Sequence, residues 1–307
     1  AVILLLFVFA LLALERWSRG RRSYAHSSAR YRPLPRFQLR GWAAAGAIIG
    51  CALPVLLGFL MPAAMLLHWA LGSPEYWQNA RFLVLLRHSF LLSGLAALLV
   101  LSVAIILAYA LRLHPTPATR FAVRVASAGY AVPGAVLAIG VLLPLAALDH
   151  ALAHWTKVHL GWNVGLVFTG TLTAVAYAYL TRFLTISFSA VEASLGKITL
   201  SMDLAARSLG RSPGQTLGLV HLPIMRGTLL TAAILVFVDV LKELPATLVL
   251  RPFNFDTLAT RTYDLASDER LVEAAGPALA IGLVGILPVY LLSRAISAAR
   301  PGAAPEA

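Results

Sequence analysis

Long apolar blocks separated by polar stretches run through most of this chain. We place the blocks near residues 1–14, 42–71, 88–111, 125–148, 164–185, 228–249 and 274–298. A membrane-crossing helix needs about 20 mostly apolar residues, whereas a membrane-crossing strand needs about ten residues of alternating polarity. No block shows that alternation. The pattern therefore predicts an all-α, polytopic transmembrane helical bundle of about seven helices.

The first block is shorter than the others. It starts at Ala1 without the basic segment of a signal peptide, and a helix of its length would cover only about 21 Å of a hydrocarbon core about 30 Å thick. We therefore expect the chain to be a fragment of a longer protein. Residues 1–41 would be the end of a preceding transmembrane helix followed by a basic linker.

Composition agrees with a membrane protein. The 307 residues are 59% hydrophobic and 12% charged, against about 25% charged in soluble domains. The net charge of +12 does not indicate nucleic-acid binding, because the arginines lie between apolar blocks and not on a basic, aromatic face. Because Cys51 is the only cysteine, the sequence has neither a disulfide framework nor a metal site of several thiolates. Membrane lipid is thus the expected environment.

Basic residues predict the orientation. Eight arginines and one acid, Glu15, lie between the first two blocks. Placing this linker in the cytoplasm puts residues 112–124, residues 182–227 and the C-terminus there too, with 18 of the 25 lysines and arginines. Because cytoplasmic loops are enriched in these residues, we expect this orientation.

The polar segment between the fifth and sixth blocks predicts a helix, a tight bend and a second helix. Gly210 suits the left-handed conformation that ends a helix. Ser212 and Gln215 have the spacing of a capping box, with Pro213 at the first helical position. Pro223 is expected to end the second helix. The result would be a compact two-helix projection on the cytoplasmic face.

This segment resembles the EAA loop of ABC importer permeases. In that family two alanines precede a glycine by about four residues, and Leu-Pro follows about twelve residues later. The matching residues within 199–223 are Ala205, Ala206, Gly210, Leu222 and Pro223, with Asp203 one place before the position of the family's acid, which is Leu204 here. The resemblance implies the ABC importer type I permease fold for residues 42–307. It also implies ABC ATPase subunits that dock on this loop and bind the ATP, so that this chain needs no cofactor.

The run from Asp239 to Arg261 resembles the permeases of ferric-iron ABC importers, which are usually long chains of two homologous halves. The likeness covers residues 84–298 and corresponds to the C-terminal half. It implies a permease subunit of the bacterial inner membrane, working with a periplasmic substrate-binding protein and the other permease half to import ferric iron. Permeases for sulfate, molybdate, thiamine and polyamines share the architecture, so those substrates remain alternatives.

Three ionisable residues, Asp239, Lys242 and Glu243, lie inside the sixth block, followed by Pro245. Such residues are costly in a bilayer and normally face the bundle interior or water. Asp239 and Lys242 are three residues apart and can pair on one face of a helix. We consider two interpretations: these residues belong to the translocation path or its gate, or they form a neutralised pair that holds helices together. A secondary transporter would instead use them as a proton or sodium relay, but it would need no ATPase-docking loop.

Catalytic residues are not expected. Gly196 and Lys197 are followed by Ile198, where a phosphate-binding loop has Ser or Thr, and the loop's first glycine is absent. We find neither a metal-ligand cluster nor clustered catalytic acids. The sequence thus predicts a transport subunit that is not itself an enzyme.

Overall fold

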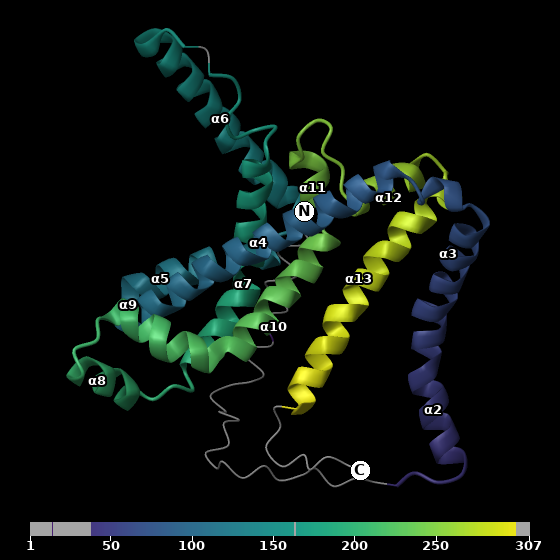
Figure 1. Cartoon of the computed structure of the whole chain (residues 1–307), viewed down its shortest axis with the longest axis horizontal. Helices are drawn as coiled ribbons and strands as arrows, with labels where there is room; N and C mark the ends of the chain where they lie inside the picture. The colour runs from purple at the N-terminus through teal and green to yellow at the C-terminus, as the bar shows by residue number, and fades with distance from the viewer. Residues whose placement is uncertain (1–13, 15–37, 163, 299–307) are drawn as a thin grey trace. The chain divides into compact units, whose positions relative to one another are not determined.

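The structure, a computed structural model, describes residue 14, residues 38–162 and residues 164–298. Every regular element in these ranges is helical (Figure 1). Five helical segments of the described ranges are long and apolar enough to cross a membrane: Trp42–Gly72, Ala80–Leu113, Gly134–Leu160, Leu172–Leu195 and Pro213–Leu241. Helix α13 (Leu271–Ala298) adds a shorter apolar stretch, Leu271–Ile286. The predicted all-helical, multi-pass architecture is confirmed, while the block at 1–14 and most of the basic linker lie outside the described residues.

The chain forms two compact units, residues 83–261 and the segments on either side of them. The first unit contains most of α4 (Ala80–Leu113), then α5 (Pro117–Ala126), η3 (Gly129–Ala131), α6 (Gly134–Leu160) and α7 (Leu172–Leu195). After α8 (Leu200–Ser208) and α9 (Pro213–Thr216), a π-helical turn, η4 (Leu217–His221), leads into α10 (Leu222–Leu241) and α11 (Pro245–Leu250).

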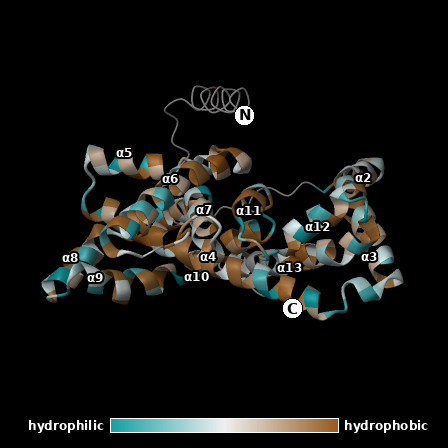
Figure 2. Ribbon diagram, turned by 90° about the horizontal axis from the view of Figure 1, so that it is seen from above, coloured by the Kyte–Doolittle hydropathy of each residue, from teal (hydrophilic) through white to brown (hydrophobic). Residues whose placement is uncertain are grey.

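Small apolar residues let the helices of the first unit approach closely. One buried cluster joins α4, α6, α7 and α10 through residues such as Val100, Ala138, Ala178 and Val236. A second cluster joins α4, α5, α7 and α10. At Gly129 an added Cβ would lie 2.0 Å from the carbonyl oxygen of Thr181, so only glycine fits. Apolar residues cover most of the long helices, and polar residues concentrate at α8, α9 and α12 (Figure 2).

The boundaries of two helices differ from the prediction. Helix α6 runs to Leu160, so most of residues 149–163, which separate two of the predicted apolar blocks, are helical. Helix α7 starts at Leu172 and runs to Leu195, so the expected loop at 182–227 begins one half-helix too early. The break between them falls in a segment with Gly161 and Gly170 at φ +67° and +70°. A hydropathy average does not detect the conformation of a single glycine, whereas the left-handed backbone at these two glycines lies where α6 ends and just before α7 starts.

The second unit packs α13 against the first membrane-crossing segment. That segment joins α2 (Trp42–Val55), a π-helical turn η1 (Leu56–Leu60) and α3 (Met61–Gly72). After η2 (Pro74–Tyr76), the Trp77 indole N–H donates to the carbonyl of Ala70 at 2.8 Å. An added Cβ at Gly276 of α13 would lie 2.6 Å from the Cβ of Trp77. Helix α12 (Leu258–Ser267) precedes α13.

Candidate functional site

The bend between α8 and α9 has the local geometry that its sequence predicts. Gly210 has φ +74°, and the amide of Arg211 donates to the carbonyl of Ala206 at 3.0 Å. Ser212 and Gln215 form both hydrogen bonds of the capping box. The bend and the start of the second helix are therefore encoded by residues adjacent in the chain.

Pro223 does not end the second helix, so that part of the prediction is wrong. It stands at the start of α10, and the helical segment from Pro213 continues to Leu241. The π-helical turn η4 immediately precedes it. A proline inside a helix removes one hydrogen bond and crowds the preceding turn, and a π-helical turn changes the spacing at that point. The bend thus joins a short helix, α8, to the end of a membrane-crossing helix, and not to a second short helix.

Asp203 faces inward and ties α8 to two other elements. Its Oδ1 lies 2.6 Å from Nε2 of His221, and its Oδ2 lies 2.7 Å from Nη2 of Arg112. Because a carboxylate only accepts, Nε2 of His221 carries the donated proton. His221 is fully buried, and both oxygens of Asp203 are engaged within the chain.

Arg112, at the end of α4, completes this joint. Its Nη1 donates to the carbonyl of Leu195 at 2.6 Å, and its Nη2 donates to the carbonyl of Ile198 at 2.9 Å. Tyr109, one turn earlier, donates to the carbonyl of Pro213 at 2.7 Å. We call Arg112, Asp203, His221 and Tyr109 the helix joint, because they connect α4, α7, α8 and the α9–α10 segment. Sequence reasoning missed Arg112 and His221 in this role, since no spacing along the chain relates them to Asp203.

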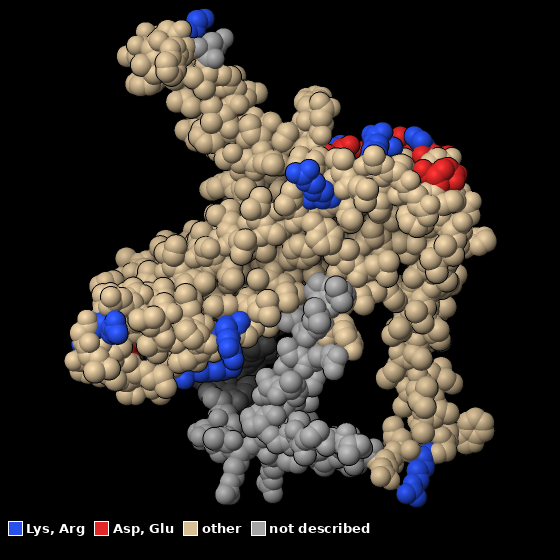
Figure 3. All heavy atoms as spheres, in the orientation of Figure 1, with Lys and Arg blue, Asp and Glu red and all other residues tan. Residues whose placement is uncertain are grey.

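The other residues of the predicted docking loop divide between surface and core. Ala205 and Pro223 are exposed, whereas Ala206 is buried and Leu222 packs against the second apolar cluster. Leu204 and Leu209 are 63% and 80% exposed. The loop therefore presents an exposed apolar surface, with the exposed arginines 207 and 211 beside it. Figure 3 shows basic side chains at the end of the unit that contains α8 and α9.

Asp239 and Lys242 form the predicted i,i+3 pair in the last turn of α10. Nζ of Lys242 lies 2.8 Å from Oδ1 of Asp239, and the Lys242 side chain is 60% exposed in this chain. The Asp239 side chain is only 21% exposed, so the pair lies at the edge of the packed surface of its unit, with the lysine end uncovered.

Glu243 does not join that pair. Its side chain is 7% exposed, and Oε2 lies 3.2 Å from Nε of Arg182 in the middle of α7. Oε1 accepts from the amide of Ala246 at 3.3 Å, and an added Cβ at Gly134 would lie 2.8 Å from Oε1. The carboxylate therefore lies beside the first residues of α6 and α11, where helix N-termini favour negative charge. Arg182, which the orientation argument counted as a loop residue, is its partner.

Pro245 begins α11 after a break at Lys242–Leu244, as its position predicts. The break is held by side chains, because Thr247 Oγ1 donates to the carbonyl of Glu243 and lies 2.6 Å from the Tyr179 hydroxyl. This places a buried polar network where α10 ends.

Asp149 is a buried residue that sequence reasoning did not single out. Its oxygens accept from the amides of Val167, Phe168 and Thr169 at 2.7–2.9 Å and from the Thr169 hydroxyl at 2.6 Å. It thereby fixes the connection between α6 and α7 onto α6. An acid inside a largely apolar helix was the available signal.

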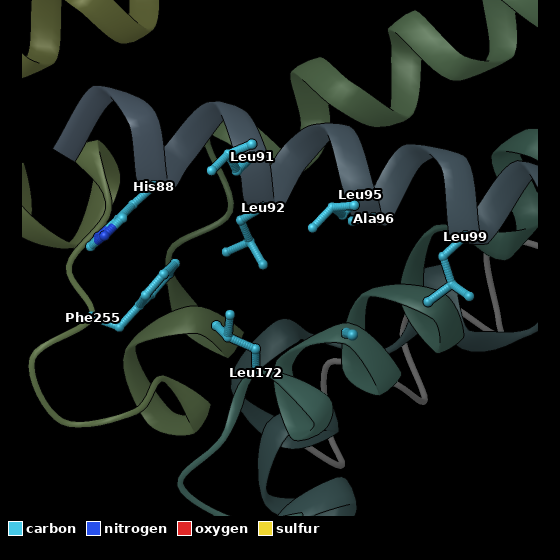
Figure 4. Close-up of a pocket in the computed structure, with 9 residues that line it drawn as sticks. His88, Leu91, Leu92, Leu95, Ala96, Leu99, Leu172 and Phe255 are labelled. Atoms are coloured by element: carbon cyan, nitrogen blue, oxygen red, sulfur yellow. The ribbon is translucent and has the colours of Figure 1, made fainter. Parts of the chain in front are cut away.

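A cavity of about 370 Å³ lies beside α4 (Figure 4). Its lining is apolar except for His88, whose ring stacks on Phe255 at a centroid distance of 4.3 Å. The lining residues are His88, Leu91, Leu92, Leu95, Ala96, Leu99, Leu172, Ala176 and Phe255. This surface has no oxygen ligand for a hard cation. Among the described residues, no three His, Cys, Asp or Glu side chains gather as a metal site.

Comparison with known proteins agrees with this architecture. No family model matches the chain. It is 26% identical over 242 residues to the Fe(3+)-transport system permease protein FbpB 2 of Haemophilus influenzae, covering 78% of this chain and 45% of that protein. It is 30% identical over 127 residues to the 2-aminoethylphosphonate transport system permease protein PhnV of Salmonella typhimurium, covering 41% of this chain and 47% of that protein. The chain thus spans about half the length of the curated relatives it matches.

Solved structures show the fold. A bacterial ABC transporter that imports the acidic polysaccharide alginate has a chain that matches with a TM-score of 0.65 and 16% identity, covering 84% of this chain and 96% of that one. A second alginate ABC transporter structure, in complex with an alginate-bound periplasmic protein, matches with a TM-score of 0.61 and 14% identity, covering 84% and 94%. The expected permease fold and the resemblance to ferric-iron permeases are both confirmed.

Proposed function

We propose that this chain is the permease subunit, or one half of it, of an ATP-driven ABC importer for ferric iron in the bacterial inner membrane. The likeness to the Fe(3+)-transport permease carries this proposal, because it extends over 78% of the chain. The protein would move its cargo without covalent chemistry, and the ATP would be bound by a partner.

The α8–α9 bend is the proposed ATPase-docking surface. The exposed Leu204 and Leu209, with the neighbouring arginines, offer an apolar and basic contact. Asp203 would support this surface from beneath and not contact the ATPase, because both its oxygens are engaged within the chain. With positive-inside orientation, this bend and the C-terminus face the cytoplasm.

Movement of α8 would reach the membrane-crossing helices through the helix joint. Arg112 connects α8 to the ends of α4 and α7, and His221 connects it to the α9–α10 segment. ATP binding that favours one docking geometry would therefore bias the bundle between inward-facing and outward-facing states. A periplasmic binding protein would deliver the cargo to the opposite face.

Asp239 and Lys242 are the proposed path-lining residues. An ion pair in the membrane that is exposed in the isolated chain would face water or another protein chain, because lipid contact is costly. We therefore place the translocation path, or the contact with the other permease half, along this face of α10. The buried Glu243 and the exposed Pro245 would form the hinge beside it.

Co-purification and uptake test the proposal together. The chain should be co-expressed with a candidate ABC ATPase and a candidate periplasmic binding protein from the same organism. We expect a stable complex and ATP-dependent uptake of radiolabelled ferric iron, lost when the α8–α9 bend is altered. A correctly inserted permease that binds no ATPase would contradict the importer assignment.

A phosphonate is the second candidate cargo. The likeness to the 2-aminoethylphosphonate permease is 30% identical, although over 127 residues only. Measuring the uptake of labelled ferric iron and of labelled 2-aminoethylphosphonate in the same strain distinguishes the two candidate cargoes. Phosphonate uptake without iron uptake would replace the cargo and leave the permease assignment in place.

A further inference from the structure

Helix α5 has a surface that the transport function does not use. It begins at Thr116, whose Oγ1 accepts from the amide of Thr119 at 3.1 Å, with Pro117 at the first helical position. It ends at Ala126. One side packs inward, where Val123 is 4% exposed and joins the cluster with Leu184 and Phe188 of α7.

The opposite side of α5 is apolar and exposed. Phe121 and Val125, four residues apart, are 70% and 59% exposed. At 100° per residue, Phe121 lies nearly opposite Val123. Arg120 and Arg124, also exposed, flank this apolar strip along one edge, and the helix contains no acidic residue. Among the described acidic side chains, none forms an ion pair with either arginine.

The neighbouring helices hold α5 at the membrane boundary. Helix α4 has 34 residues and is therefore about 51 Å long, whereas a bilayer with its headgroups is about 40–45 Å thick. Three residues after α4, α5 turns back toward α7, where the Thr185 hydroxyl donates to the carbonyl of Ser127. Thr185 lies about ten residues before the end of α7. If α4 and α7 both cross the bilayer, α5 lies at its boundary, because it follows the end of α4 and packs on the half of α7 that leads to Leu195.

We propose that α5 is an interfacial helix that binds anionic phospholipid. Phe121 and Val125 enter the acyl region, and Arg120 and Arg124 contact the phosphate groups of lipids in the leaflet nearest the α8–α9 bend. Arginine suits this contact because its stem lies along apolar surface while its head reaches the phosphates. Anionic lipid would thereby hold α5 and, through Val123, brace the ends of α4 and α7. The proposal requires only that α4 and α7 cross the bilayer, so it does not depend on the cargo or on ATP.

Site-directed labelling of the whole chain tests the depth. In a Cys51→Ser background, the single substitutions Phe121→Cys, Val125→Cys and Leu209→Cys each receive a nitroxide, and the protein is placed in nanodiscs of phosphatidylcholine and phosphatidylglycerol at 3:1. We expect labels at 121 and 125 to collide with oxygen more than with a water-soluble nickel complex, and the label at 209 to show the reverse. Water-accessible labels at both 121 and 125 would overturn the proposal.

A second measurement tests the arginines. A bimane attached to the Val125→Cys variant is quenched in separate samples by nitroxide-labelled phosphatidylglycerol and by nitroxide-labelled phosphatidylcholine. The ratio of the two quenching efficiencies gives the local preference for the anionic lipid. Each arginine near such a surface favours it by about fivefold, so Arg120→Gln with Arg124→Gln should reduce the preference by up to about 30-fold. The control, Arg207→Gln with Arg211→Gln, removes the same charge from the bend and should leave the ratio unchanged.

The arms also separate lipid from protein. If the label at 125 is shielded from water only after the ATPase is added, the face docks a protein and the lipid proposal is wrong. An unchanged quenching ratio in the variant with Arg120→Gln and Arg124→Gln would also contradict the lipid proposal. Failure of the chain to bind an ATPase leaves both measurements interpretable, because they are made on the permease chain alone.

Discussion

Replacing Arg112 by methionine should release α8 from the helix joint. The guanidinium donates to Asp203 Oδ2 from Nε at 3.0 Å and from Nη2 at 2.7 Å, and it also donates to the carbonyls of Leu195 and Ile198. Methionine keeps an apolar stem of similar length and removes all four hydrogen bonds. Asp203 is then left as a largely buried charge with His221 as its remaining partner.

The expected magnitude follows from burial. Removing one partner of a buried ion pair costs about 3–5 kcal/mol. The side chains of Arg112 and Asp203 are 13% and 15% exposed, so we take the lower end, about 3 kcal/mol. That corresponds to a change of about 150-fold in the equilibrium for local opening of α8.

Hydrogen exchange in nanodiscs measures this opening directly. The amides of α8, residues 200–208, should lose about 150-fold of their protection in Arg112→Met. The control Arg207→Met removes an exposed arginine from the same helix and should change protection by less than about threefold. With Asp203→Asn added, the effects should fall short of additivity by at least about 1 kcal/mol, because the two residues act through one contact. Unchanged protection in Arg112→Met, or strict additivity, would refute the helix joint.

Three further predictions concern the bend, the buried pair and the connection before α7. Gly210→Val should reduce ATP-coupled uptake severalfold, whereas Gly210→Asn should retain most of it, because asparagine tolerates positive φ and valine does not. Equal uptake by both variants would contradict the requirement for a left-handed residue at the bend. Glu243→Gln should destabilise the protein by about 3 kcal/mol, because Arg182 then keeps a buried charge without its partner. Lys242→Gln should cost less than about 1 kcal/mol, because that side chain is 60% exposed. Thermal unfolding of both variants in one detergent compares them, and equal losses of stability would argue against the buried pair. Asp149→Asn should increase the rate of amide hydrogen exchange at residues 167–169 by at least about tenfold, because the carboxylate accepts charge-assisted hydrogen bonds from these amides. Wild-type exchange rates in the variant would show that the connection holds without the carboxylate.

Features with short range along the chain were predictable from the sequence. The membrane-crossing helices follow from apolar length, and the bend follows from glycine, serine, proline and glutamine at fixed spacings. The Asp239–Lys242 pair follows from helical periodicity. Each of these depends on residues a few positions apart, where helix geometry alone brings groups together. The resemblance to the EAA loop rests on the same local spacing.

Only the tertiary structure decided which charges distant in the sequence meet. Arg112 and Asp203 are 91 positions apart, and Arg182 meets Glu243 from the middle of α7, although the orientation argument counted it as a loop residue. Pro223 looked like a helix end, but the preceding π-helical turn lets the helix continue. A buried charge selects its partner from everything that packing brings within reach, and the small residues at Gly129 and Gly134 set that packing. The amino-acid sequence by itself therefore determined the helices and their local caps, while the contacts between helices determined whether each ionisable residue is buried in the fold or faces outward.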